Sequence, residues 1–215
     1  TVNGYLDTME NITMEDMMRM QTSAYSLYAR EALAGCWPLL DETKLSEEER
    51  AAMQLLKDWD HHFTASAHAP VLFEIWQDSV YRMTFDEIFS LEKEQAMLYP
   101  EDWRLIELLE TTPENAIFDH QGTQSVETAA DIVLMAFQEA VKNWSAEETW
   151  AERNRASVNH MAGISPFSRP NLDMNGNGVT INAIRRDHGP SWRMIVEMDP
   201  DGVRAHGLYP GGQSG

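Results

Sequence analysis

The sequence predicts an α+β protein in which a helical block, residues 1–165, is followed by antiparallel strands, residues 166–215. In the first block, apolar residues recur at the three- and four-residue spacing of helices, behind residues that favour helix N-termini. After about residue 165, apolar residues recur at every second position, as in strands, and prolines and glycine-rich turns separate these stretches. The strands are few and end abruptly, so we expect this second block to be truncated at its C-terminus and to belong to a larger sheet.

The first long helix is expected to begin behind Thr13, because Asp16 three residues later approximates a capping box. Apolar residues then follow near helical spacing: Met14, Met17, Met18, Tyr25, Tyr28 and Leu33. The pattern predicts helix from Thr13 to Leu33.

Two further helices follow. Ser46 with Glu49 repeats the capping box, and the apolar stripe behind it is Met53, Leu56 and Trp59. Residues 69–83 form the next helix, with a stripe of Leu72, Ile75, Trp76, Val80 and Met83. We interpret these methionines and tryptophans as core residues rather than a substrate pocket.

Two more helix starts are expected before the strands. Ser125 precedes a stripe of Ala129, Ile132, Val133, Phe137, Ala140 and Val141. Ser145, with Glu148 as its capping-box partner, opens another helix.

Strands are predicted at residues 178–184, 191–198 and 203–209. In the first of these, three apolar residues alternate with polar ones: Val179, Ile181 and Ala183. The segment from Asp199 to Gly202 is expected to join the other two as a hairpin turn. Gly176 and Gly178 are expected to supply positive φ before the first strand. Three strands make a thin sheet, so we expect them to expose an apolar face or an unpaired edge.

Composition excludes several classes of function. The 215-residue chain has a formal net charge of -19, which argues against binding a phosphate backbone and suits a solvated surface or a more basic partner. No segment approaches the roughly 20 continuous apolar residues of a membrane span. The single cysteine, Cys36, precludes an internal disulfide and is expected to be a buried, unreactive residue. No signal peptide is recognisable in the chain.

Several groups of polar residues resemble metal or acid–base sites. Residues of metal-ligating type gather between positions 58 and 68: Asp58, Asp60, His61, His62 and His68. Helical metal ligands need i,i+3 or i,i+4 spacing, which the adjacent His61 and His62 lack, so we interpret the group as polar residues at helix ends. A set of four carboxylates is interpreted as a solvated helix face: Asp86, Glu87, Glu92 and Glu94.

A calcium loop is suggested by the run "DMNGNG", which begins at Asp173. Such a loop needs glutamate at its twelfth position, where this chain has Ile184. We therefore interpret the run as a structural turn.

Two residues are candidate nucleophiles, Ser214 and Thr1. Ser214 in "GQSG" suggests a nucleophile elbow, but the helix that must follow one is missing. Thr1 carries an α-amine that is able to act as its base, but it leads into a polar helix start rather than a sheet. Neither is assigned a catalytic role.

Four segments resemble the penicillin acylase (penicillin amidase) family of N-terminal-nucleophile hydrolases: residues 12–33, 72–89, 127–141 and 176–215. The most specific is the last, in which "GPSWRMIVEM" and a further strand precede "GGQSG". The resemblance covers nearly the whole chain and places it in the C-terminal part of the family's large subunit. The chain is thus expected to be a fragment, with "YPGGQSG" in the interior of a longer protein.

The resemblance implies a four-layer αββα fold in the full protein, with a nucleophile, commonly serine, that is released at the start of the large subunit when a precursor cleaves itself. It also implies oxyanion donors and a structural calcium site upstream, and a periplasmic or extracellular location. None of these motifs matches a residue here, so the sequence assigns no catalytic, cofactor-binding or metal residue to this chain.

Two functions remain open. In the first, the chain is part of an amidohydrolase for linear amides (the acyl side chain of a β-lactam, an acyl-homoserine lactone or a similar N-acyl compound), inactive without the small subunit and the rest of the large subunit. In the second, it is an acidic helical binding domain that has lost catalysis.

Overall fold

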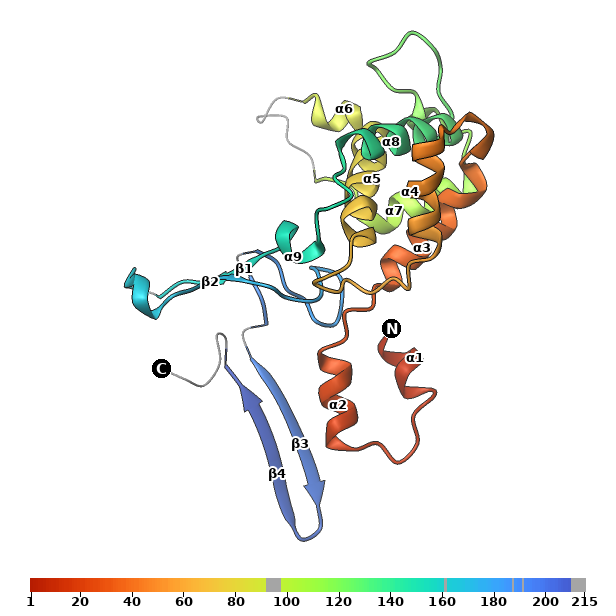
Figure 1. Ribbon diagram of the computed structural model, residues 1–215. Helices are drawn as coiled ribbons and strands as arrows, with labels where there is room; N and C mark the ends of the chain where they lie inside the picture. Colours follow the sequence, from red (N-terminus) through yellow and green to blue (C-terminus); the bar gives the residue numbers. More distant parts are fainter. Residues whose placement is uncertain (92–97, 161, 187, 191, 210–215) are drawn as a thin grey trace. The chain divides into compact units, whose positions relative to one another are not determined.

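A computed structural model describes residues 1–91, 98–160, 162–186, 188–190 and 192–209 (Figure 1). The chain divides into two compact units, each built from separate segments. The helical unit comprises Tyr28–Trp59 and His68–Glu148. The strand-bearing unit comprises Thr1–Leu27, Asp60–Ala67 and Thr149–Gly215. Helices followed by small antiparallel sheets confirm the predicted α+β class.

The helical unit contains the longer helices of the described chain. Its elements are α3 (Leu27–Cys36, whose first residue belongs to the other unit), η1 (Trp37–Leu39), η2 (Glu42–Lys44), α4 (Glu47–Lys57), α5 (Ala69–Thr84), α6 (Asp86–Phe89), α7 (Asp102–Thr111), η4 (Ala116–Phe118) and α8 (Ala129–Asn143). The sequence pattern anticipated α4, α5 and α8, whereas it gave no expectation for α7.

Capping decides where two of these helices begin. The predicted capping box of α4 is confirmed, since Ser46 and Glu49 each accept a hydrogen bond from the other's backbone N–H. The expected cap of α8 at Ser125 is wrong, because Thr128 and Asp131 form the box three residues later. The Ser125 hydroxyl instead donates to Glu127 Oε1 at 2.7 Å.

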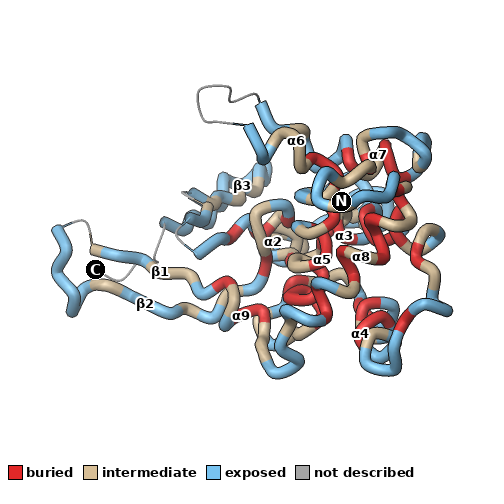
Figure 2. Tube along the Cα trace, turned by 90° about the horizontal axis from the view of Figure 1, so that it is seen from above, coloured by how far each residue is buried: buried red, intermediate tan, exposed pale blue. Residues whose placement is uncertain are grey.

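The core of the helical unit is apolar and aromatic. Helices α5 and α8 pack side by side (Figure 1). At their contact, the Trp76 ring lies 4.9 Å from that of Phe137 and 5.3 Å from that of Trp37, between centroids. Trp76 Nε1 donates to the Val133 carbonyl at 3.2 Å, so this buried tryptophan leaves no polar atom unpaired. In Figure 2, buried segments are concentrated along α3, α5 and α8.

The strand-bearing unit has shorter elements. They are α1 (Val2–Leu6), α2 (Met14–Gln21), α9 (Trp150–Arg153), β1 (Ala156–Val158), η5 (Ser165–Phe167), β2 (Arg169–Leu172), β3 (Arg193–Asp199) and β4 (Gly202–Leu208). Strands β1 and β2 form one antiparallel pair, and β3 and β4 form another. None of the helices in the described part of the chain has the length and hydropathy needed to span a bilayer.

The helix expected from Thr13 to Leu33 is interrupted. It ends at Gln21 as α2, and α3 begins only at Leu27. Between them the backbone pairs with residues 61–63: Ser26 N–H donates to the His61 carbonyl at 2.9 Å, and Phe63 N–H donates to the Ala24 carbonyl at 3.0 Å. Pairing with a distant segment thus replaces the local helix.

The helix expected at Ser145 is also displaced. Ser145 and Glu148 form a turn, and α9 begins behind Thr149, whose capping-box partner is Glu152. Two residues of α9 attach to an earlier segment, since Trp150 and Ala151 donate their backbone N–H groups to the carbonyls of Ala67 and Ala65, each at 2.8 Å.

The strand expected at 178–184 is not present; this stretch is a folded loop. Thr180 and Asn182 are buried in place of an apolar face, and the Thr180 hydroxyl lies within hydrogen-bond distance of the carbonyls of Asn177 and Asn182. Gly176 has the expected positive φ, 91°. Gly178 does not, and instead faces the Arg185 guanidinium, where a Cβ would collide.

The hairpin of β3 and β4 follows the prediction, with Asp199 opposite Gly202 at its turn. Directly opposed residues share a face of the pair. One face therefore carries Met194 opposite Gly207, Val196 opposite Ala205 and Met198 opposite Val203. Met198 is 78% exposed and Val203 62%. This set is called the apolar hairpin face below, and it confirms that the strands expose an apolar surface.

The opposite face of the hairpin mixes polar and apolar residues, since Ile195 lies opposite His206, and β3 lies beside α2 (Figure 1). Glu197 and Arg204 form an ion pair across the strands. His206 Nδ1 lies 2.6 Å from Met14 Sδ on α2, and Gln21 Nε2 donates to the Met194 carbonyl at 3.1 Å. Helix α2 therefore lies against only one face of the hairpin.

Candidate functional site

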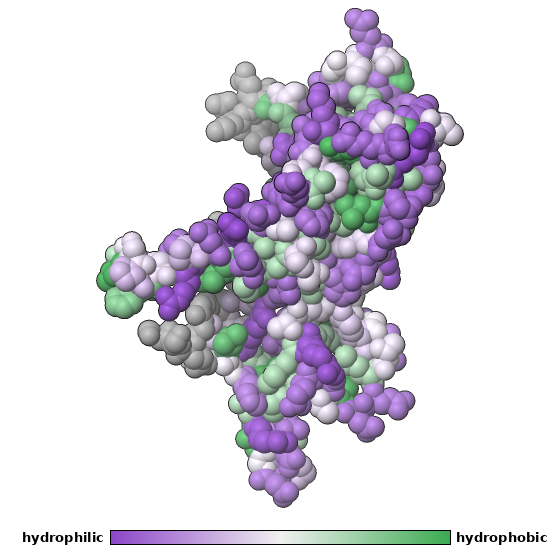
Figure 3. All heavy atoms as spheres, viewed as in Figure 1, coloured by the Kyte–Doolittle hydropathy of each residue, from purple (hydrophilic) through white to green (hydrophobic). Residues whose placement is uncertain are grey.

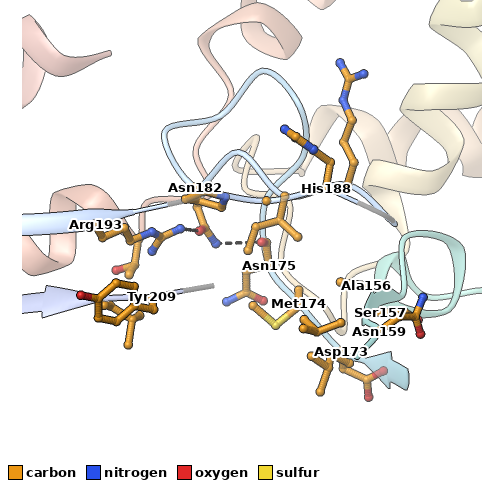
Figure 4. A pocket seen from close by; sticks show the side chains of 18 residues that line it. Ala156, Ser157, Asn159, Asp173, Met174, Asn175, Asn182, His188, Arg193 and Tyr209 are labelled. Atoms are coloured by element: carbon orange, nitrogen blue, oxygen red, sulfur yellow. Dashed lines mark hydrogen bonds between the residues drawn. The ribbon is translucent and has the colours of Figure 1, made fainter. Parts of the chain in front are cut away.

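A cavity of about 780 Å³ lies in the strand-bearing unit (Figure 4). Its wall comes from segments distant in sequence: residues 156–159, residues 172–175, the base of the hairpin at Arg193, Leu208 and Tyr209, and, from the stretch between them, Asn182, Ile184, Arg185, His188, Gly189 and Pro190. The volume is in the range of pockets that hold small organic ligands.

The floor of the cavity is fixed by a polar network behind it. The Gly176 carbonyl accepts from Trp150 Nε1 at 2.8 Å and from Asn154 Nδ2 at 3.3 Å. Asn154 Nδ2 also donates to the Ile184 carbonyl at 3.1 Å, and Gly176 N–H donates to the Phe63 carbonyl at 2.7 Å. These buried hydrogen bonds hold the 175–184 loop in place, because leaving any of the groups unpaired would cost free energy.

Arg193, the first residue of β3, is the half-buried charge of this cavity. Its guanidinium donates to Asn182 Oδ1. Burial lowers the pKa of Arg193 below its usual range, but an arginine remains charged in a protein. The site therefore carries a positive charge that meets a neutral amide.

The rest of the wall is mainly apolar. Aliphatic and aromatic side chains from four segments line it: Val158, Leu172, Met174, Ile184, Leu208 and Tyr209. Asp173 is the acidic residue of the described lining, and its Oδ1 lies 3.6 Å from Arg155 Nε. Arg185 and His188 add two basic side chains.

One hydroxyl of the described lining belongs to Ser157. Acyl transfer needs a nucleophile hydrogen-bonded to a base. The Ser157 hydroxyl lines the cavity and accepts from Asn171 N–H at 3.4 Å. Among the described residues, no hydrogen bond joins Ser157 to His188.

The histidine-rich segment forms no metal centre in the part of the chain that the structure describes. His62 N–H donates to Asp60 Oδ1 at 3.0 Å, and His68 Nδ1 lies 3.0 Å from the Glu148 carbonyl. These contacts fit the interpretation as polar residues at helix ends.

The carboxylates from Asp86 to Glu94 are only partly where they were expected. Asp86 and Glu87 are half-buried, so the solvated-face prediction is wrong for them. Asp86 Oδ2 lies 2.6 Å from His120 Nδ1, and burial is the largest cause that raises the pKa of Glu87. Glu92 and Glu94 lie outside the described residues.

The remaining candidates are Cys36, Thr1 and Ser214. Cys36 is buried as expected, and burial raises the pKa of its thiol to about 12, which opposes reactivity. Thr1 is the N-cap residue of α1 and makes no side-chain capping bond. Ser214 lies outside the described residues.

Comparison with known protein families shows the family to which the chain belongs. The penicillin amidase family model matches residues 1–215. The chain belongs to the penicillin amidase family. This confirms the resemblance at the level of the family and relates the chain to amide hydrolases.

Sequence reasoning did not identify the cavity of this penicillin amidase family member. Arg193 stands in "GPSWRMIVEM", which carried the family resemblance, but nothing in that run marks it as half-buried. A signal in the sequence was available at Asn182. It occupies one of the alternating polar positions of the predicted strand 178–184, and in the fold its side chain is buried. Its contact with Arg193 arises only when the 175–184 loop folds against β3.

Proposed function

We propose that this chain is part of an amidohydrolase that cleaves a linear amide by N-terminal-nucleophile acyl transfer, and that residues 1–215 alone are inactive. The family match along the whole chain is the observation that carries the proposal. The proposed substrates are N-acyl compounds: the acyl side chain of a β-lactam, an acyl-homoserine lactone or a similar amide.

The apolar hairpin face supports a role within a larger assembly. Exposed apolar sheet faces are normally packed against another layer. We propose that the hairpin lies within the family's catalytic sandwich, and that the covering layer comes from the small subunit and the rest of the large subunit. The C-terminal part of the large subunit is the proposed place of this chain in such an enzyme.

The chemistry supports a nucleophile outside residues 1–215. Acyl transfer brings a nucleophile, a proton acceptor and oxyanion donors within about 3 Å of one carbonyl. The described side chains around the cavity offer no such set. The proposed enzyme uses a serine exposed by precursor cleavage, with a structural calcium ion upstream, and acts in the periplasm or outside the cell.

The test compares the isolated chain with a precursor expressed from the complete coding sequence. The precursor is expected to cleave itself into two subunits and to hydrolyse a chromogenic phenylacetyl or long-chain acyl amide, whereas residues 1–215 show no turnover. Steady turnover by the isolated chain, lost on substitution of a residue within it, would overturn the proposal.

A second function is favoured by the charge of the helical unit. This unit has its own core and carries 24 acidic and 8 basic residues, a net charge of -16. Such a surface suits a basic binding partner. A precursor that neither cleaves itself nor hydrolyses either amide would support an acidic binding domain derived from the family.

A further inference from the structure

Arg193 is unusual for a chain with 35 acidic and 16 basic residues. Half-buried arginines are normally paired with carboxylates, because burial makes an unpaired charge costly. Among the described residues, no carboxylate lies within ion-pairing distance of Arg193, and one of its five N–H donors is hydrogen-bonded. Within the part of the chain that the structure describes, the other donors have no protein acceptor, and Arg193 lines the cavity.

Asn182 holds this guanidinium without neutralising it. Asn182 Nδ2 donates to the Asn175 carbonyl at 2.8 Å, and its backbone N–H donates to the Ser23 carbonyl at 2.9 Å. The amide is thereby fixed with Oδ1 toward Arg193, as the dashed lines in Figure 4 show. Fixing the guanidinium in advance lowers the entropy cost of binding an anion there.

The surroundings select the chemistry of the anion. Aliphatic and aromatic side chains form much of the wall, and the acidic side chain, Asp173, has Arg155 beside it. Arg185 and His188 line the same cavity and bring further donors to its wall. An apolar wall with basic side chains along part of it fits a ligand with an apolar body and an anionic end.

We propose that this cavity is a binding site for an organic monocarboxylate with an apolar body, whose carboxylate accepts hydrogen bonds from Arg193. The planar guanidinium matches the two oxygens of a carboxylate, and such charge-assisted pairs are about twice as strong as neutral hydrogen bonds. The site goes beyond the proposed amide hydrolysis and requires no nucleophile, so its test does not depend on catalysis.

The probe is 4-phenylbutyrate, titrated into residues 1–215 by isothermal calorimetry. Its matched control is 4-phenylbutyramide, which has the same body but no charge. The acid is expected to bind at least about tenfold more tightly than the amide. Added salt is expected to weaken binding of the acid but not binding of the amide. In parallel, the Arg193 Nε–Hε signal in NMR spectra should shift with the acid.

Variants assign the binding to Arg193. Arg193→Gln is expected to weaken binding of the acid at least about tenfold, and Arg193→Lys by less, because lysine keeps the charge but loses the planar fork. Arg204→Gln is the matched control: it removes an arginine from the same hairpin, but one that is exposed and paired with Glu197. It is expected to leave the affinity within twofold.

Asn182→Asp gives a test that keeps Arg193. A carboxylate at this position would occupy the guanidinium, so binding of the acid is expected to fall; because the substitution also removes the hydrogen bond from Asn182 Nδ2 to the Asn175 carbonyl, urea unfolding of the variant is measured beside its affinity. Equal binding of acid and amide, unchanged affinity in Arg193→Gln, or no binding of the acid to residues 1–215 would each overturn the proposal. The last result would favour a carboxylate supplied by another protein segment.

Discussion

The two units of this chain are stabilised in different ways. The helical unit buries tryptophan, phenylalanine and aliphatic side chains between α5 and α8 and carries a net charge of -16. In the view of Figure 3, hydrophilic side chains cover much of its surface. The strand-bearing unit has 11 acidic and 8 basic residues, a net charge of -3, and it buries Asn154, Thr180 and Asn182.

The difference shows what each unit requires. The interior of the helical unit is filled mainly by apolar and aromatic side chains, which pack by size and shape. The strand-bearing unit depends on particular hydrogen bonds to the 175–184 loop, and its hairpin leaves an apolar face exposed.

The largest expected effect is in the helical core. Trp76→Ala removes a buried side chain that contacts Phe137 and Trp37, and is expected to lower the free energy of unfolding by about 3–5 kcal/mol. Trp103→Ala is the matched control, since Trp103 on α7 is 63% exposed, and should cost less than about 1 kcal/mol. Urea titration followed by circular dichroism measures both. Similar losses in the two variants would contradict the assignment of the core.

A smaller effect is expected from the polar interior of the other unit. Asn154→Ala removes the donor to the carbonyls of Gly176 and Ile184, and should lower the free energy of unfolding by about 1–3 kcal/mol. Asn159→Ala, at an exposed position, is the control. Amide hydrogen exchange of residues 175–184 should increase in the first variant and not in the second. Unchanged exchange in both would show that the loop is held by other contacts.

The smallest effect is expected on the apolar hairpin face. Met198→Lys should change the free energy of unfolding of residues 1–215 by no more than about 0.5 kcal/mol, because Met198 is exposed. The same variant should reduce self-association measured by light scattering, since it places a charge on an apolar surface. Ile195→Lys, on the face beside α2, should destabilise the chain more than Met198→Lys does. The reverse order would mean that the apolar hairpin face is already covered within the chain.

Local signals in the sequence were sufficient for several elements. Ser46 with Glu49 predicted the start of α4, since a capping box is made within four residues. The turn from Asp199 to Gly202 predicted the hairpin for the same reason, because its geometry depends on the residues of the turn itself. All six residues of the predicted α8 stripe are buried, and so are Leu72, Trp76 and Val80 of the predicted α5 stripe, whereas Ile75 and Met83 are only half-buried.

Other features depended on residues far apart in the chain. The alternation at 178–184 resembled a strand, but Thr180 and Asn182 are buried by hydrogen bonds that no local pattern shows. The break between α2 and α3 arises because Ala24 and Ser26 pair with residues 61–63. The start of α8 was misplaced at Ser125, although the sequence held the better signal at Thr128, which has Asp131 as its capping-box partner three residues later.

By itself, the sequence determined the α+β class, the main helices and the hairpin, because periodicity, caps and turns act over a few residues. It also determined the family, since the resemblance extends along the whole chain. Only the tertiary structure decided that Arg193 meets Asn182 at a cavity assembled from distant segments. The physical reason is that the burial of a side chain and its hydrogen-bond partners arise only when distant segments fold together, so neither can be read from the position of an arginine in the sequence.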